Sequence, residues 1–213
     1  SWKGLPRYCF EGDNFSMWSY LNIHGNWTAP WFRVTGGLAD VAHKNGVSVG
    51  CVASIPYGQS IRVSGGTNTW SQVMAALTKK NSDGTFANSE RFVKLLKYYG
   101  IDGVGVNSEF NGNYATMKQI QGFFADCHKK AEAIGWHFQL HWYDGTNDAG
   151  SLSFDGGLGS HNKGMFGTGD NIVTDMMFSN YNTGHSTLVG SATNAKAWGR
   201  NPYDYYKGFD IQG

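Results

Sequence analysis

The feature that most constrains the fold is a repeated order of apolar strand, polar loop and helix along the chain. Strands are predicted where β-branched and aromatic residues are bounded by Gly, Asn or Asp. They lie at Met17–His24, Val47–Ser54, Gly103–Glu109, His137–Asp144, Asn171–Tyr181 and Gly208–Gln212. Helical patterns lie between them at Gly37–Asn45, Asn68–Thr78, Ser89–Tyr99, Tyr114–Ile134 and Ser186–Ala197. Strands that alternate with helices predict βαβ units and a parallel sheet.

The helical pattern before the third strand is the most regular one. Phe92, Leu95, Leu96 and Tyr99 recur at the spacing of one helix face. We expect Ser89 to cap the start of this helix and Gly100 to end it.

Two architectures have a parallel sheet of this kind, the doubly wound sheet and the (β/α)8 barrel. No strand is followed by GxGxxG or GxxxxGK[ST], so a nucleotide-binding sheet has little support. Polar residues gather where the strands end, and the carboxyl ends of barrel strands carry active sites. We therefore predict an α/β fold of the (β/α)8 TIM-barrel type.

The predicted strands are fewer than the eight of a complete barrel, and the 213 residues are fewer than the ~250 typical of one. We expect residues 1–213 to form a single barrel domain that lacks a strand at each end.

Composition excludes several classes of function. The formal net charge is +1 with scattered Lys and Arg, so no nucleic-acid partner is expected. No run approaches the ~20 apolar residues of a membrane span. The three cysteines and seven histidines lack metal-ligand spacing, so we expect neither a metal nor another cofactor. Abundant aromatic residues, 15% of the chain, suit either carbohydrate recognition or a packed core, and composition leaves both open.

The stretch "DGVGVNSE" places chemical groups at the end of an apolar strand. Side chains alternate along a strand, so Gly105, Asn107 and Glu109 share one face, and Val104 and Val106 share the other. The valines are expected to pack under helices, while Asn107 and Glu109 enter one cavity with their Cα atoms about 7 Å apart. Such an acid could protonate a leaving oxygen, or it could be an ordinary hydrogen-bonded loop acid.

This stretch resembles the catalytic strand of family 18 glycosidases, DGxDxDxE, with Gly105 and Asn107 in place of the two inner aspartates. It is more similar to family 85 glycoside hydrolases, the endo-β-N-acetylglucosaminidases, whose strand reads roughly FDGxxxNxE. Further segments resemble that family in the same order, namely "LADVAHKNGVSVGCV", "SERFVKLLKYYG", "LHWYDG" with "GLGSHNKGMF", and "FSNY" with "YYKGFDIQG".

The resemblance implies hydrolysis of the GlcNAc–GlcNAc core of N-linked glycans, with the substrate's 2-acetamido oxygen as nucleophile. Glu109 would be the acid and base, and Asn107 would orient the acetamide without adding a second negative charge beside Glu109. Tyr143 would hydrogen-bond the same acetamide region. The implied partner is an N-glycan or glycoprotein, and the implied place of action is extracellular or at the cell envelope.

Five further residues are candidate glycan contacts. His24, Asn180 and Gln212 stand near strand ends, Asn162 follows a Gly-rich loop, and Phe154 is the nearest aromatic after "WYD", where the family often has Trp. Each could instead organise a loop or strand end. Trp142 alternates with Tyr143 and is expected in the core.

Two other functions stay open at this point. The chain could be a carbohydrate-binding barrel without catalysis, since Asn182 and Thr183 stand where the family often has aromatics after "FxNY". It could also be a different glycosidase that pairs Glu109 with a second carboxylate, such as Asp144 or Asp210.

Overall fold

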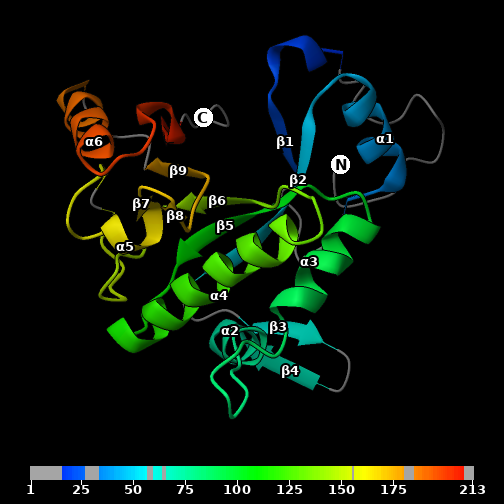
Figure 1. Ribbon diagram of the computed structural model, residues 1–213, viewed down its shortest axis with the longest axis horizontal. Coiled ribbons are helices and arrows are strands. Elements are labelled where there is room, and N and C mark those ends of the chain that lie inside the picture. The colour runs from blue at the N-terminus through cyan, green and yellow to red at the C-terminus, as the bar shows by residue number, and fades with distance from the viewer. Residues whose placement is uncertain are drawn as a thin grey trace.

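The computed structural model describes residues 16–26, 34–56, 60–63, 66–154, 156–179 and 185–208 (Figure 1). Within these residues, parallel strands form a six-stranded sheet that curls into half a barrel. The strands follow chain order across it: β1 (Ile23–Asn26), β2 (Ser48–Pro56), β5 (Gly103–Glu109), β6 (Gln139–Tyr143), β9 (Met176–Ser179) and β10 (Tyr205–Lys207). The predicted α/β fold of the TIM-barrel type is thereby confirmed for these six strands.

Helices connect the strands of the sheet, and α3 and α4 lie together against one face of it in Figure 1. The α-helices are α1 (Gly36–Lys44), α2 (Trp70–Leu77), α3 (Ser89–Tyr98), α4 (Tyr114–Glu132), α5 (Lys163–Phe166) and α6 (His185–Ala197). Two short 3-10 helices are η1 (Trp18–Tyr20) and η2 (Pro202–Asp204). Two hairpins stand outside the sheet, β3 (Ser60–Val63) with β4 (Gly66–Thr69) and β7 (Gly167–Thr168) with β8 (Asn171–Ile172).

Strand boundaries are right at the centre of the sheet and wrong toward its edges. β5 has the predicted bounds. The predicted strand Met17–His24 begins instead as η1, because Trp18 is buried while Met17 and Tyr20 are exposed, which is not a strand alternation. The predicted strand Asn171–Tyr181 is divided between β8 and β9. The last strand of the described chain is β10, upstream of the predicted Gly208–Gln212, most of which lies outside the described residues.

The start of α2 and the cap of α3 differ from the prediction. α2 begins at Trp70 because Thr69 forms a capping box with Gln72, in which the Thr69 hydroxyl accepts from the Gln72 N–H and the Gln72 side chain accepts from the Thr69 N–H. The N-cap of α3 is Asn88, and the Ser89 hydroxyl instead donates to Asp126 at 2.5 Å. The cap prediction for Ser89 was therefore wrong.

The core lies between the sheet and its helices. Val104, Val106 and Trp142 are buried on the helix-facing side, as alternation along β5 and β6 predicted. Against them, four rings from α3, α4 and the start of β6 pack largely edge to face at centroid distances of 5.3 to 6.4 Å: Phe92, Phe123, Phe124 and Phe138. On α3 the buried face is formed by Phe92, Val93 and Leu96, whereas the predicted Leu95 and Tyr99 are exposed.

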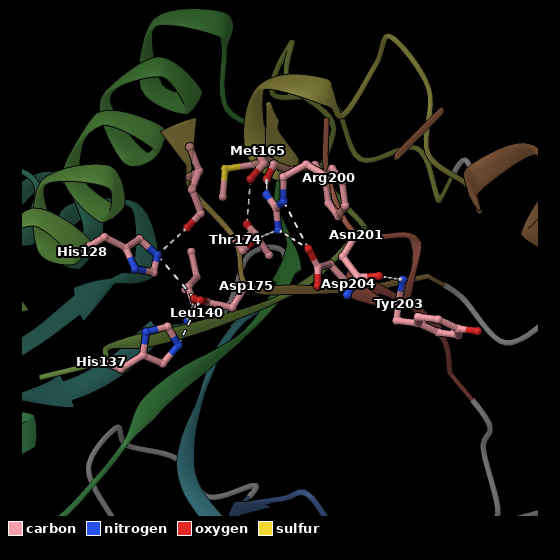
Figure 2. Close-up of polar contacts among 12 residues, drawn as sticks. His128, His137, Leu140, Met165, Thr174, Asp175, Arg200, Asn201, Tyr203 and Asp204 are labelled. Carbon is pink, nitrogen blue, oxygen red and sulfur yellow. Dashed lines mark hydrogen bonds and ion pairs between the residues drawn. The ribbon is translucent and has the colours of Figure 1, made fainter. Parts of the chain in front are cut away.

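Two aspartates tie neighbouring strands together in the same way, just before β5 and β9. Asp102 accepts a hydrogen bond from the Val49 N–H at 2.7 Å and contacts His43 of α1 at 2.8 Å. Asp175 accepts from the Leu140 N–H at 2.7 Å and lies 3.4 Å from His128 of α4, as Figure 2 shows. In both cases the histidine belongs to the helix that precedes the neighbouring strand. Asp102 of the "DGVGVNSE" stretch is therefore a structural residue at the amino end of the strand.

A buried arginine, Arg200, holds the chain next to Asp175. Arg200 donates to the Thr174 carbonyl at 2.9 Å, to the Phe166 carbonyl and to Asp204, and its guanidinium lies over the Phe166 ring (Figure 2). Its charge is compensated by the Asp204 carboxylate, which anchors η2 and the start of β10.

Candidate active site

The strand register brings Asn107, Tyr143 and Phe178 side by side on the face opposite to the helices. Asn107 of β5 is the register partner of Tyr143 in β6, which is in turn the partner of Phe178 in β9. Side chains of register partners point to the same face of a sheet. Gly105 and Glu109 share this face with Asn107, so we call it the inner face.

The amide and the acid at the end of β5 are in direct contact. The Asn107 Nδ2 donates a hydrogen bond to the Glu109 Oε2 at 3.2 Å. Asn107 is almost completely buried, and Glu109 is half-buried. Asn107 therefore fixes one oxygen of the Glu109 carboxylate, while Glu109 itself stays partly exposed on the inner face.

Glycines in β5 make room for this arrangement. A Cβ on Gly103 would lie 2.3 Å from the Gln139 carbonyl oxygen, so only glycine permits this close approach of β6. A Cβ on Gly105 would meet the Val52 side chain at 3.4 Å, which is ordinary contact. Gly105 thus adds no side chain of its own to the layer below Asn107, which it shares with Val52 and His141.

Aromatic rings frame the carboxyl end of β6. Tyr143 stacks on Phe178 with a centroid distance of 5.2 Å and an interplanar angle of 27°. Phe154 approaches the other side of Tyr143 with a centroid distance of 6.3 Å. The Asp144 N–H donates to the Phe178 carbonyl at 2.9 Å, which holds the end of β6 against β9.

Phe154 is held in a strained conformation next to Tyr143. Its φ of +46° is the one positive value among the described non-glycine residues. The Ser153 and Phe154 N–H groups both donate to the Gly145 carbonyl, at 2.9 and 3.4 Å, which closes the loop that carries the ring. Phe154 is 39% exposed, so part of its ring faces solvent on the side away from its contact with Tyr143. Strained residues of this kind gather at functional sites.

His141 is an inner-face residue that the sequence interpretation missed. It is the register partner of Gly105, one layer below Asn107 and Tyr143. Burial lowers the pKa of His141 from 6.5 to about 4, so the imidazole is neutral at neutral pH. Alternation backward from Tyr143 would have indicated it, since residues two apart share a strand face.

The register separates His24 from this cluster. His24 pairs with Val49, and Val49 shares a face with Cys51 and its partner Val104, which is the helix-facing side. The His24 ring lies 5.8 Å from the buried Trp18 ring. The structure therefore places His24 with the packing between β1 and α1 and does not bring it to the Asn107–Glu109 pair.

Asn162 is buried and makes hydrogen bonds through both ends of its amide. Its Nδ2 donates to Asp144 Oδ2 at 2.6 Å and to the Gly157 carbonyl at 2.8 Å, and its Oδ1 accepts from the Gly159 N–H at 2.9 Å. These contacts are those of a residue that organises the loop after β6. A direct glycan contact by Asn162 stays a prediction.

A second, partly buried side chain, that of Asp148, anchors the same loop. Asp148 accepts from the N–H groups of Gly164 and Met165, at 2.6 and 3.0 Å, and from the Gln121 side chain at 2.7 Å. Partial burial raises the pKa of the Asp148 carboxyl, while its hydrogen bonds from the Gly164 and Met165 N–H groups act in the opposite direction. The loop after β6 is thus fastened to both α4 and α5.

The remaining candidates, Asn180 and Gln212, lie outside the described residues. Within the described ranges, no three His, Cys, Asp or Glu side chains converge in a way that could hold a metal ion. None of the helices in that part of the chain combines the length and apolar character needed to cross a membrane.

The comparisons with known proteins concern the sequence family and the fold of the chain. The sequence model of glycosyl hydrolase family 85 matches residues 9–213. The glycoside hydrolase domain of Endo-D from Streptococcus pneumoniae R6 is similar over 93% of this chain, with 25% sequence identity and a TM-score of 0.78. The chain spans 30% of the length of that structure. No curated protein sequence matches the chain.

Two further solved structures have TM-scores below 0.5, and such a likeness supports no conclusion about function. A candidate sporulation-specific glycosylase from Bacillus subtilis has 13% identity and a TM-score of 0.48, over 83% of this chain and 56% of its own. The spore cortex-lytic enzyme SleL from Bacillus megaterium QM B1551 has 12% identity and a TM-score of 0.42, over 83% of this chain and 42% of its own.

The half-barrel and the family match together define a glycoside hydrolase barrel. Because the family match covers almost the whole chain, the chain belongs to glycosyl hydrolase family 85.

Proposed function

We propose that this chain forms part of the catalytic domain of an endo-β-N-acetylglucosaminidase that hydrolyses the GlcNAc-β-1,4-GlcNAc core of N-linked glycans. The observation that carries the proposal is the Asn107–Glu109 hydrogen bond on the inner face beside Tyr143. The similarity to Endo-D supports the same class of activity.

The arrangement suits a reaction in which the substrate supplies its own nucleophile. The 2-acetamido oxygen attacks the anomeric carbon, the glycosidic bond breaks, and Glu109 gives its proton to the leaving GlcNAc oxygen. Glu109 then takes a proton from the water that opens the oxazoline intermediate. With Nδ2 directed at Glu109, Asn107 keeps Oδ1 to accept the acetamide N–H and orient the attacking oxygen.

Three aromatic rings around the end of β6 shape the proposed site, namely Tyr143, Phe154 and Phe178. The Tyr143 ring contacts both Phe178 and Phe154, which fixes it on the inner face beside Asn107, where the acetamide group would lie. Phe154 offers an exposed face on which a sugar ring can stack.

A glycosidase that uses two enzyme carboxylates has less support. Asp144 is buried, hydrogen-bonded to Asn162, and follows Tyr143 toward the helix-facing side. Asp210 lies outside the described residues. A carbohydrate-binding barrel without catalysis stays the second candidate, and it predicts binding of chitobiose-type glycans with no turnover.

The test is release of glycan from a glycopeptide by the protein expressed from its complete reading frame. Replacement Glu109→Gln should lower the rate about 10²- to 10⁴-fold, since the general acid is lost. Glu90→Gln is the matched control, because Glu90 lies exposed on α3, where it forms an ion pair with Lys94. Wild-type activity in Glu109→Gln would exclude Glu109 as the acid.

Asn107 is tested with a preformed sugar oxazoline. Asn107→Ala should lose hydrolysis of the glycopeptide yet still accept the oxazoline, because the step that needs the oriented acetamide is already complete. Unchanged hydrolysis by Asn107→Ala would refute the role given to Asn107.

A further inference from the structure

Thr146, in the loop after β6, forms hydrogen bonds with the residues directly before and after Glu109 in the sequence. Its hydroxyl accepts a hydrogen bond from the Phe110 N–H at 3.1 Å and lies 2.8 Å from the Phe110 carbonyl and 3.3 Å from the Ser108 carbonyl, to which it can donate. The Thr146 N–H donates to the Ser108 hydroxyl at 3.2 Å. Thr146 is buried, so these bonds form away from solvent.

These contacts replace the sheet ladder at the point where it stops. Pairing of β5 with β6 ends at Asn107, two residues before Glu109. On the other side, the register partner of Glu109 is Pro56, which has no N–H to donate. The backbone around Glu109 therefore depends on the loop after β6 for part of its hydrogen bonding.

The backbone of the loop after β6 lies close to β5 and to the segment that follows it. A Cβ on Gly145 would lie 2.2 Å from the Ser108 carbonyl oxygen, so a glycine is required for the loop to approach β5 this closely. Farther along, the Gly112 N–H donates to the Gly150 carbonyl at 2.7 Å and the Leu152 N–H donates to Asn111 Oδ1 at 2.9 Å. The same loop thus continues along the segment that follows Glu109.

We propose that Thr146 is a positioning residue for Glu109, which fixes the carboxylate relative to Asn107 through the backbone of Ser108 and Phe110. The inference rests on the proposed function of Glu109 as acid and base. Because Thr146 belongs to the loop that also carries Phe154, the aromatic side of the site and the acid are held by one structural unit.

The test compares two substitutions at Thr146 with one control. Thr146→Val keeps the shape but leaves the Phe110 N–H without its acceptor, and Thr146→Ser keeps the hydroxyl. Thr174→Val is the control, since Thr174 is equally buried and donates to the Met165 carbonyl at 2.7 Å, before β9 at the opposite end of the strands.

Glycopeptide hydrolysis gives the first readout. Misplacement of the acid should lower kcat of Thr146→Val about 10-fold or more with KM within about twofold, because ground-state binding is not changed. Thr146→Ser should restore kcat, and Thr174→Val should keep it. Equal kcat in wild type and Thr146→Val, or an equal loss in Thr174→Val, would overturn the inference and leave the proposed function intact.

Hydrogen exchange of the Phe110 amide gives a second readout that needs no activity. Its exchange should be faster in Thr146→Val than in wild type and unchanged in Thr174→Val. If wild type releases no glycan, the proposed function fails; unchanged exchange at Phe110 would then also overturn the structural part of the inference. If Thr146→Val does not fold, Ser108→Ala removes only the acceptor of the Thr146 N–H and should show smaller changes of the same kind.

Discussion

Lowering the pH from 7 to 4 is expected to destabilise this protein through one buried side chain, His141. Burial on the inner face lowers the pKa of His141 from 6.5 to about 4. In the unfolded chain the imidazole is solvated, and it takes up a proton near the ordinary pKa of histidine. Between these two values the unfolded state holds more protons than the folded state. The contribution of His141 to the free energy of unfolding therefore rises with pH across this window, and it is lost as the pH falls through the window.

The size of the effect follows from the difference between the two pKa values. At about 1.4 kcal/mol for each pKa unit, a change from 6.5 to about 4 corresponds to about 3 kcal/mol. Such a loss is a large part of the 5–15 kcal/mol by which a domain is typically stable, about 10 kcal/mol in the middle of that range.

The assay must separate His141 from other groups that titrate. Burial raises the pKa of Asp175, so protonation of Asp175 favours the folded state as the pH falls and opposes the effect of His141. We therefore compare urea unfolding of wild type and His141→Gln at several pH values between 7.5 and 4, since glutamine is of similar size and does not titrate. Groups common to both proteins cancel in the difference.

The expected result is a difference that depends on pH. We take the free energy of unfolding of His141→Gln minus that of wild type. This difference should be about 3 kcal/mol larger at pH 4 than at pH 7.5. A difference that stays constant over this range would refute the claim that His141 is neutral and buried in the folded state.

Two further substitutions separate binding from stability. Phe154→Ala should raise KM for the glycopeptide several-fold while the melting temperature stays close to that of wild type, because the ring is 39% exposed and meets Tyr143 in a tilted contact with the centroids 6.3 Å apart; a normal KM would exclude sugar stacking on Phe154. Asp102→Ala should lower the free energy of unfolding by about 1–3 kcal/mol, measured by urea unfolding, because the buried Val49 N–H loses its acceptor, and kcat should remain at the wild-type level. A selective loss of kcat in Asp102→Ala would show that this aspartate is catalytic after all.

Much of the fold follows from local pattern. The run Gly103–Glu109 has the composition and bounds of a buried strand, and β5 has the same limits in the structure. Patterns at the edges of the sheet are less informative. The β3–β4 hairpin was not predicted, because β3 alternates polar and apolar residues over four positions only, and β4 contains no large apolar residue that would mark a buried face.

The sequence by itself determined that Asn107 and Glu109 share one strand face and that Val104 and Val106 are buried on the other, because alternation depends only on the extended backbone. The family resemblance rested on the same local runs of residues.

The tertiary structure decided which residues of other segments lie beside the pair in space. Strand register put His141 and Tyr143 on the inner face and His24 on the helix-facing side, and register is set by packing between segments far apart in the chain. The contact of Thr146 with Ser108 and Phe110 spans 36 to 38 residues, and it exists only because the loop after β6 folds back over the end of β5.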